Sequence, residues 1–154
     1  MISAKVQLTQ PLTSARQFVG TVGSEHHMLL DDAAGGTGPK PIELLAVGLA
    51  GCTAFDVITI LRQKFRQKVT GYEVRVEAEQ AERPPQVFTL VGIHHVVTGF
   101  EIDSSAIEQA IRLSEEKYCS VAAMVKQTAR LDTSYEIVAE KTQWLAPSPA
   151  TVNG

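Results

Sequence analysis

The stretch Gly38–Val57, with the sequence GPKPIELLAVGLAGCTAFDV, decides the fold. It follows a loop rich in Gly and Pro, and it contains almost only apolar side chains up to Asp56. Glu43 lies where the first helical turn would be, and a carboxylate there interacts favourably with the positive end of the helix dipole. We therefore predict a long helix from about Pro41 to Gln67, apolar in its first half and basic in its second half.

The apolar run Leu44–Leu61 approaches the length of a membrane span. Asp56 interrupts the run, and the basic residues Arg62 and Lys64 follow it directly. An unpaired carboxylate inside a bilayer costs a few kcal/mol or more. A helix that is apolar nearly all round is also typical of the centre of a soluble core. We therefore predict a buried core helix and no membrane partner.

The size and composition favour one globular domain over residues 1–139, followed by a flexible tail over residues 140–154. The chain has 154 residues, of which 44% are hydrophobic and 20% are charged, and the tail carries Pro147 and Pro149. The net charge of -3 provides no basic excess for binding nucleic acid. Two cysteines are too few for a disulfide scaffold, and the first residues do not resemble a signal peptide. These features predict a cytoplasmic protein without a nucleic-acid partner.

The order of the predicted elements indicates an α+β fold. Strand patterns cover residues 5–9, 16–22, 25–30, 72–78, 87–97 and 131–138, and further helical patterns follow Asp103 and cover residues 119–127. The strands occur in blocks on either side of the helices, rather than in strict alternation with them. This order predicts mostly antiparallel sheets.

The two cysteines, Cys52 and Cys119, both lie in predicted helical segments rich in Ala and Gly. Small residues let two helix backbones approach closely, which would bring the thiols within disulfide reach, with Cα atoms roughly 4.4 to 6.8 Å apart. Free cysteines are also among the most buried residues, and these two could simply fill space. The residues alone leave both interpretations open.

The stretch Gly38–Val57, together with Lys117–Val121 (KYCSV), resembles the OsmC/Ohr family of osmotically inducible and organic hydroperoxide resistance proteins, within its OsmC-like subgroup. The resemblance extends in element order from about Arg16 to Val138. It implies an intertwined homodimer in which mostly antiparallel sheets wrap around two long central helices. It also places the active sites at the subunit interface.

The resemblance further implies a thiol-dependent peroxidase that reduces organic hydroperoxides or hydrogen peroxide. Cys52 would be the residue that attacks the peroxide, and Cys119 would resolve the sulfenic acid into a Cys52–Cys119 disulfide. A dithiol reductant would reopen this disulfide, and no cofactor is implied. In the family, an arginine held by a glutamate stabilises the thiolate, and Arg16 and Glu43 are the candidates here. Glu43 is nine residues before Cys52, which on a straight helix turns the two side chains roughly 180° apart.

Asp56 supports an alternative function. It lies four residues after Cys52, so the two side chains share a helical face, and an ionised carboxylate there would raise the pKa of the thiol. A cation such as Lys126 or Arg130 would neutralise it. Without such a cation, the cysteine would not be tuned for fast peroxide reduction. The alternative is therefore a non-catalytic protein of the same fold that binds a small apolar ligand or acts as a slow redox sensor.

The histidine pairs His26-His27 and His94-His95 raise the question of a metal site. Adjacent residues on a strand face opposite sides of the sheet, so each pair offers at most one ligand to a shared site. Cys52 or Cys119 could supply further ligands, but the spacing matches no known metal motif. We therefore predict no metal site.

Overall fold

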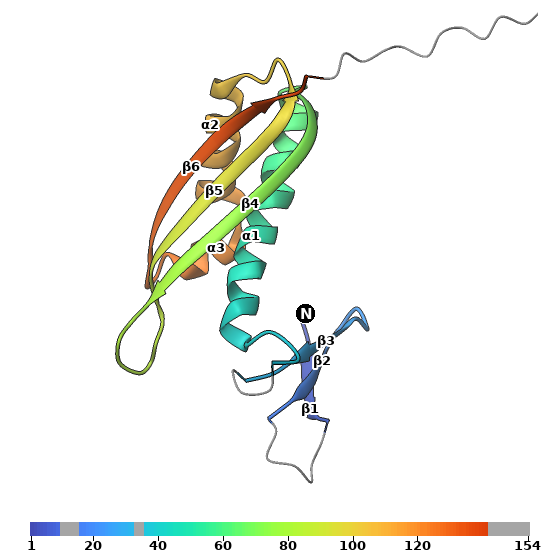
Figure 1. Ribbon diagram of the computed structural model, residues 1–154, viewed down its shortest axis with the longest axis vertical. Coiled ribbons are helices and arrows are strands. Elements are labelled where there is room, and N and C mark those ends of the chain that lie inside the picture. The colour runs from blue at the N-terminus through green and yellow to red at the C-terminus, as the bar shows by residue number, and fades with distance from the viewer. Residues whose placement is uncertain (10–15, 33–35, 142–154) are drawn as a thin grey trace, which may run out of the picture. The chain divides into compact units, whose positions relative to one another are not determined.

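The computed structural model describes residues 1–9, 16–32 and 36–141 of the chain (Figure 1). Most of the predicted tail, residues 142–154, lies outside the described part. The chain divides into two compact units, Met1–Leu49 and Ala50–Gly154.

The N-terminal unit contains a three-stranded antiparallel sheet in the order β1-β2-β3. The strands are β1 (Ala4–Leu8), β2 (Phe18–Val22) and β3 (His27–Leu30), in the three regions with strand patterns. After β3, the buried carboxylate of Asp31 accepts hydrogen bonds from the backbone N–H and the hydroxyl of Thr37. These bonds hold the turn that leads into the first helix.

The first helix, α1 (Pro41–Thr59), continues into a π-helical turn, η1 (Ile60–Lys64). The helix therefore begins at the predicted residue and ends three residues before the predicted one. Its buried side chains are spaced four residues apart, at Leu49, Thr53, Val57 and Leu61. By length and composition alone, Pro41–Lys64 could cross a membrane, and 22% of its most apolar window is buried. We expected a helix buried nearly all round, whereas the described part of this chain covers mainly one face.

The C-terminal unit contains a second sheet in the order β4-β5-β6. Its strands are β4 (Lys68–Gln80), β5 (Phe88–Phe100) and β6 (Arg130–Ala139). β4 and β5 pair antiparallel, but β5 and β6 pair parallel. The parallel pair follows from the helical connection between these strands, because such a connection returns the chain to the same end of the sheet. It comprises α2 (Ser104–Leu113), the π-helical turn η2 (Ser114–Tyr118) and α3 (Ser120–Val125).

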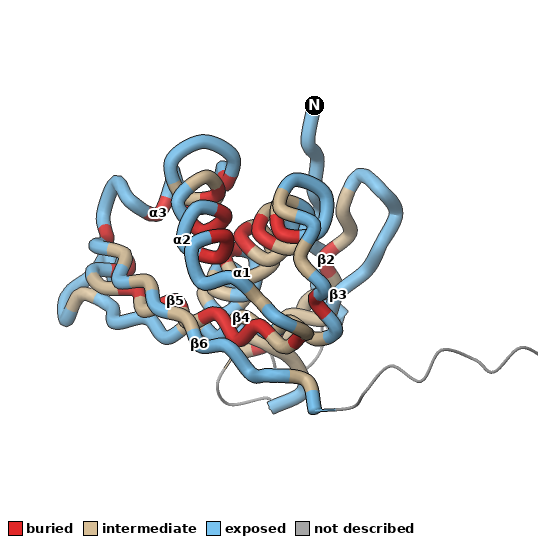
Figure 2. Tube along the Cα trace, turned by 90° about the horizontal axis from the view of Figure 1, so that it is seen from above, coloured by how far each residue is buried: buried red, intermediate tan, exposed pale blue. Residues whose placement is uncertain are grey.

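The helices of this unit lie on one face of the β4-β5-β6 sheet (Figures 1 and 2). The core between them is formed by apolar side chains from α1, η1, α2, β4 and β5: Val57, Leu61, Val69, Val97, Ala106, Ile107, Ala110 and Ile111. Asp103 caps α2, since its carboxylate accepts a hydrogen bond of 2.9 Å from the backbone N–H of Ser105. The observed architecture is α+β, as the element order predicted.

Candidate functional site

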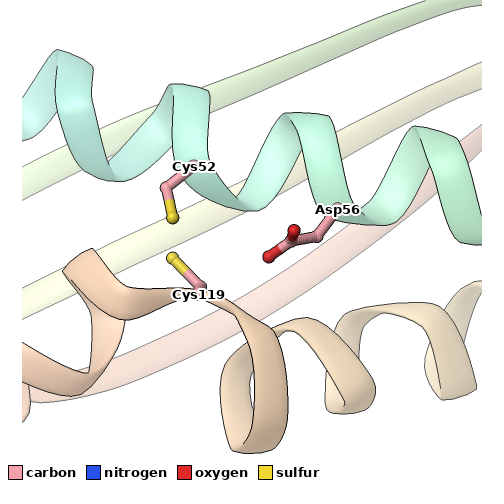
Figure 3. A group of neighbouring side chains, drawn as sticks. All are labelled: Cys52, Asp56 and Cys119. Atoms are coloured by element: carbon pink, nitrogen blue, oxygen red, sulfur yellow. The ribbon is translucent and has the colours of Figure 1, made fainter.

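The two cysteines meet within the C-terminal unit. Cys52 lies in the middle of α1, and Cys119 precedes the first residue of α3. The sulfur of Cys52, the sulfur of Cys119 and a carboxylate oxygen of Asp56 all lie within 4.8 Å of one another. Figure 3 shows the two sulfurs pointing toward each other, with the Asp56 carboxylate beside them. Both thiols are free, and their sulfurs are close neighbours.

Cys119 is held in place by backbone hydrogen bonds on both sides. Its N–H donates to the carbonyl oxygen of Ser114 over 2.8 Å, which ends the η2 turn. Its backbone is extended, so its sulfur can act as the N-cap of α3 and accept a hydrogen bond of 3.3 Å from the N–H of Ala122. The local geometry therefore directs the Cys119 sulfur toward α1.

The environment of Cys119 favours the neutral thiol. Burial raises the pKa of Cys119 to about 12, and the hydrogen bond to Cys52 and the charge of Asp56 act in the same direction. The N–H of Ala122 opposes these effects without cancelling them. Cys119 is 3% exposed, whereas Cys52 is only half-buried. Cys52 is therefore the thiol that a molecule from solvent reaches first.

The Asp56 carboxylate is held by Ser114, a residue that the sequence motifs did not single out. The fully buried hydroxyl of Ser114 donates a hydrogen bond of 3.0 Å to the Asp56 carboxylate, and it lies 3.3 Å from the hydroxyl of Thr53. The sequence did contain a sign that Ser114 is buried. Ser114 follows Ala110 by four residues and Ile111 by three, so it continues the buried face of α2.

The two cations that could have neutralised Asp56 are engaged elsewhere. Lys126 donates to the carbonyl oxygen of Glu115 over 2.9 Å, and Arg130 pairs with Asp132 at 2.6 Å. Among the described residues, Asp56 therefore forms no ion pair with either of them.

A cavity of about 460 Å³ lies beside Asp56. Its lining residues come from α1, η1 and η2: Phe55, Asp56, Thr59, Ile60, Gln63, Lys64 and Tyr118. Asp56 belongs both to this lining and to the group of three neighbouring side chains around the sulfurs. Asp56 therefore connects the cavity to the cysteine pair, although neither cysteine is among the lining residues.

Arg16 and Glu43, the candidates for activating Cys52, both belong to the N-terminal unit. The Nε of Arg16 pairs with a carboxylate oxygen of Asp32 at 2.7 Å, and Arg16 lines a cavity of about 350 Å³ in that unit. Glu43 accepts a hydrogen bond of 2.7 Å from the backbone N–H of Lys40 at the start of α1. Each side chain thus has a local partner, and their action on Cys52 stays a prediction.

The histidines on β5 face opposite sides of the sheet, as the sequence predicted. His94 lies 2.8 Å from the hydroxyl of Ser134 and 3.5 Å from Glu136, whereas His95 is buried and lies 2.6 Å from the hydroxyl of Tyr72. Within the described ranges, the group of potential metal ligands contains Cys52, Asp56 and Cys119 and no histidine.

Comparison with known proteins identifies the family. The family model described as OsmC-like protein matches residues 34–134. This chain belongs to the OsmC-like family. The OsmC-like chain is also 39% identical to Protein YhfA of Escherichia coli K12 over 138 residues, which cover 90% of this chain and 99% of YhfA.

Solved structures support the OsmC-like fold. A hypothetical protein from Aquifex aeolicus is 30% identical and superposes with a TM-score of 0.79, covering 92% of this chain and 98% of that protein. The organic hydroperoxide resistance protein OhrB of Bacillus subtilis superposes with a TM-score of 0.59 at 16% identity, covering 88% and 98%. The second likeness concerns the fold alone. The predicted membership in the OsmC/Ohr family, which includes peroxide-related stress proteins, is confirmed.

Proposed function

We propose that this OsmC-like protein is a thiol peroxidase that reduces organic hydroperoxides or hydrogen peroxide through Cys52 and Cys119. The observation that carries the proposal is the approach of the two sulfurs to within 4.8 Å of each other. Membership in a family that contains organic hydroperoxide resistance proteins supports the same chemistry.

The first step is attack by the Cys52 thiolate on one oxygen of the peroxide. A sulfur–oxygen bond forms and the oxygen–oxygen bond breaks, so that the other oxygen leaves, takes up a proton and becomes an alcohol or water. Cys52 is thereby oxidised to a sulfenic acid. Its partial exposure supports its role as the attacking residue, since Cys119 is buried.

The second step joins the two cysteines. The Cys119 sulfur attacks the sulfur of the sulfenic acid, and the hydroxyl group leaves as water with the proton of the Cys119 thiol. A dithiol reductant then restores both thiols by thiol–disulfide exchange and is itself oxidised to a disulfide. The high pKa of Cys119, about 12, fits a residue that stays a thiol until Cys52 has been oxidised.

The cavity beside Asp56 supports an organic hydroperoxide as the substrate. Phe55, Ile60 and Tyr118 supply apolar or aromatic surface on its walls, and Asp56 belongs both to these walls and to the cluster around the sulfurs. Apolar walls with a few polar groups are typical of small-molecule sites. An alkyl or aryl group would pack against this surface while the peroxide oxygens face the sulfurs.

The proposal includes a homodimer in the cytoplasm, where thiols are kept reduced. Support for the dimer comes from the uncovered apolar surface of the C-terminal unit. Phe55 on α1 is 79% exposed, and a methyl group added at Gly51 would meet nothing within 4 Å apart from its chain neighbours and the nearby backbone of its own helix. A second copy of the chain would cover this face.

Peroxide turnover by cysteine variants tests the proposal. We expect the reduced full chain to consume cumene hydroperoxide repeatedly when dithiothreitol is supplied, and Cys52→Ser to abolish this consumption. Cys119→Ser should still oxidise once and accumulate a sulfenic acid that dimedone traps, as mass spectrometry would show. Ala123→Ser, at an exposed position on α3, is the control and should keep full turnover.

Two results would contradict the peroxidase. Equal consumption by wild type and Cys52→Ser would remove Cys52 from the chemistry. Formation of the disulfide without repeated turnover would favour the slow redox sensor instead.

A further inference from the structure

We infer that Cys52, Cys119 and Asp56 form a three-ligand site for a thiophilic divalent cation, with Zn²⁺ as the best match. This inference does not depend on peroxide reduction. It rests on the ligand atoms, on the groups that hold them, and on the charge of the cluster.

The ligand atoms suit zinc in type and spacing. Zn²⁺ binds cysteine sulfur and carboxylate oxygen, and a tetrahedral ion with Zn–S bonds of about 2.3 Å holds two sulfurs about 3.8 Å apart. The three atoms here already lie within 4.8 Å of one another, so a small side-chain adjustment suffices. Three protein ligands leave a fourth position open for water, as in catalytic zinc sites.

The ligands stand on elements that limit their movement. Cys52 and Asp56 are four residues apart on α1 and therefore share one helical face. The two histidines of the His-Glu-x-x-His zinc motif have the same spacing for the same reason. Cys119 approaches from the turn before α3, so the ion would be held from two sides.

Two hydrogen bonds act as an outer shell. The Ser114 hydroxyl donates to the Asp56 carboxylate over 3.0 Å, and the Ala122 N–H donates to the Cys119 sulfur over 3.3 Å. In metal sites, outer-shell partners of this kind orient the ligands. Each hydrogen bond uses one lone pair of the Asp56 carboxylate or of the Cys119 sulfur, and the other lone pairs of these atoms can bind a cation.

The charge of the cluster also favours a cation. Asp56 lies beside two thiols, and within the described ranges it forms no ion pair with a lysine, an arginine or a histidine. A divalent ion would displace the thiol protons and offset most of the negative charge that results. Access is available through the half-buried Cys52.

Metal titration of the reduced full chain tests the site. With a phosphine in place of a thiol reductant, we expect one Co²⁺ per chain, with thiolate-to-cobalt charge-transfer bands, and one Zn²⁺ per chain in competition with a chromophoric chelator. Cys52→Ser and Cys119→Ser should each abolish the charge-transfer spectrum of the wild type. Asp56→Asn should weaken Zn²⁺ binding by at least the roughly 10- to 100-fold that loss of an outer-shell partner costs. Asp132→Asn, exposed on β6, is the matched control and should leave the affinity unchanged.

A second readout needs no variant. Saturating Zn²⁺ should protect both cysteines of the wild type from alkylation by N-ethylmaleimide, as measured by mass spectrometry. Absence of binding, unchanged affinity in Asp56→Asn, or alkylation of both cysteines at the free rate would each overturn the site. A chain that binds Zn²⁺ in this way but turns over no peroxide would keep the metal site and lose the proposed activity.

Discussion

At the scale of single residues, His95 shows how burial sets a protonation state. Its Nδ1 lies 2.6 Å from the hydroxyl of Tyr72, and its Nε2 has no hydrogen-bond partner among the described residues. Burial, with a smaller effect from His94, lowers the pKa of His95 to about 4, and burial raises the pKa of Tyr72. Both side chains are therefore neutral at pH 7, and the Tyr72 hydroxyl and Nδ1 share one hydrogen bond.

This low pKa predicts a loss of stability in acid. Between pH 6.5 and 4, an unfolded His95 binds a proton that the folded one does not, so the free energy of unfolding increases with pH across this range. Above pH 6.5, the neutral state of His95 costs the folded protein nothing. As the pH falls toward 4, the free energy of unfolding decreases by roughly 3 kcal/mol in total. Urea unfolding at a series of pH values measures it. His95→Phe should flatten the profile relative to wild type, and His94→Gln should not.

If the profiles of wild type and His95→Phe are parallel between pH 4 and 6.5, then His95 does not titrate as its burial implies. The wild-type profile must be compared with that of His95→Phe, because carboxylates also titrate at the acid end of this range and change the stability of both proteins.

The sequence predicted some of these residues better than others. The small residues around Cys52 and Cys119 left two interpretations open, close approach or simple packing, and the resemblance to the OsmC/Ohr family singled the two cysteines out. Cys119, predicted to lie in a helical segment, is instead the extended N-cap of α3. Whether the two cysteines meet depends on how α1 packs against the η2–α3 turn, and spacing along the chain does not encode that packing. The partner of Asp56 was missed for a related reason, since charge pairing suggested Lys126 or Arg130, whereas the buried Ser114 hydroxyl is the observed donor.

At the scale of elements, Gly99 fixes how β5 fits against its neighbours. A Cβ at Gly99 would clash with the backbone carbonyl oxygen of Lys68 on β4 and lie 2.7 Å from the side chain of Ile102. Backbone on one side and core on the other leave no room for a methyl group. Gly92, on the same strand, would place its Cβ 3.9 Å from the nearest group, the carbonyl oxygen of Glu77.

We predict that Gly99→Ala lowers the free energy of unfolding by about 1–3 kcal/mol, the usual cost of overpacking. Gly92→Ala is the matched control and should change it by less than about 0.5 kcal/mol. Chemical denaturation at pH 7 gives both values. Equal effects of the two substitutions would show that β4 and β5 separate easily at Gly99.

Local sequence patterns predicted where the helices and strands lie, but they did not predict which strands pair. The apolar run and Glu43 predicted the start of α1, and Asp103 predicted the start of α2. The parallel pairing of β6 with β5 was not predicted, because alternation of apolar and polar residues identifies a strand but not its partner or direction.

At the scale of the whole molecule, α1 presents more apolar surface than the described part of the chain covers. The sequence indicated a helix that is apolar nearly all round, which implies that something must cover every face. Among the described residues of the C-terminal unit, the buried face of this helix is the one with Thr53, Val57 and Leu61. Sequence alone could not distinguish cover by the same chain from cover by a second copy, because both require the same apolar residues.

The exposed aromatic side chain of Phe55 should therefore control dimerisation. Burying an aromatic anchor at the centre of an interface typically contributes at least about 2 kcal/mol, so Phe55→Glu should raise the dimer Kd by about 30-fold or more. Val138→Glu, at an exposed position on β6, is the control and should leave the Kd unchanged. Sedimentation equilibrium over a range of protein concentrations measures both values. A wild-type chain that stays monomeric, or a Phe55→Glu chain that dimerises as tightly as wild type, would mean that the uncovered face of α1 has another partner.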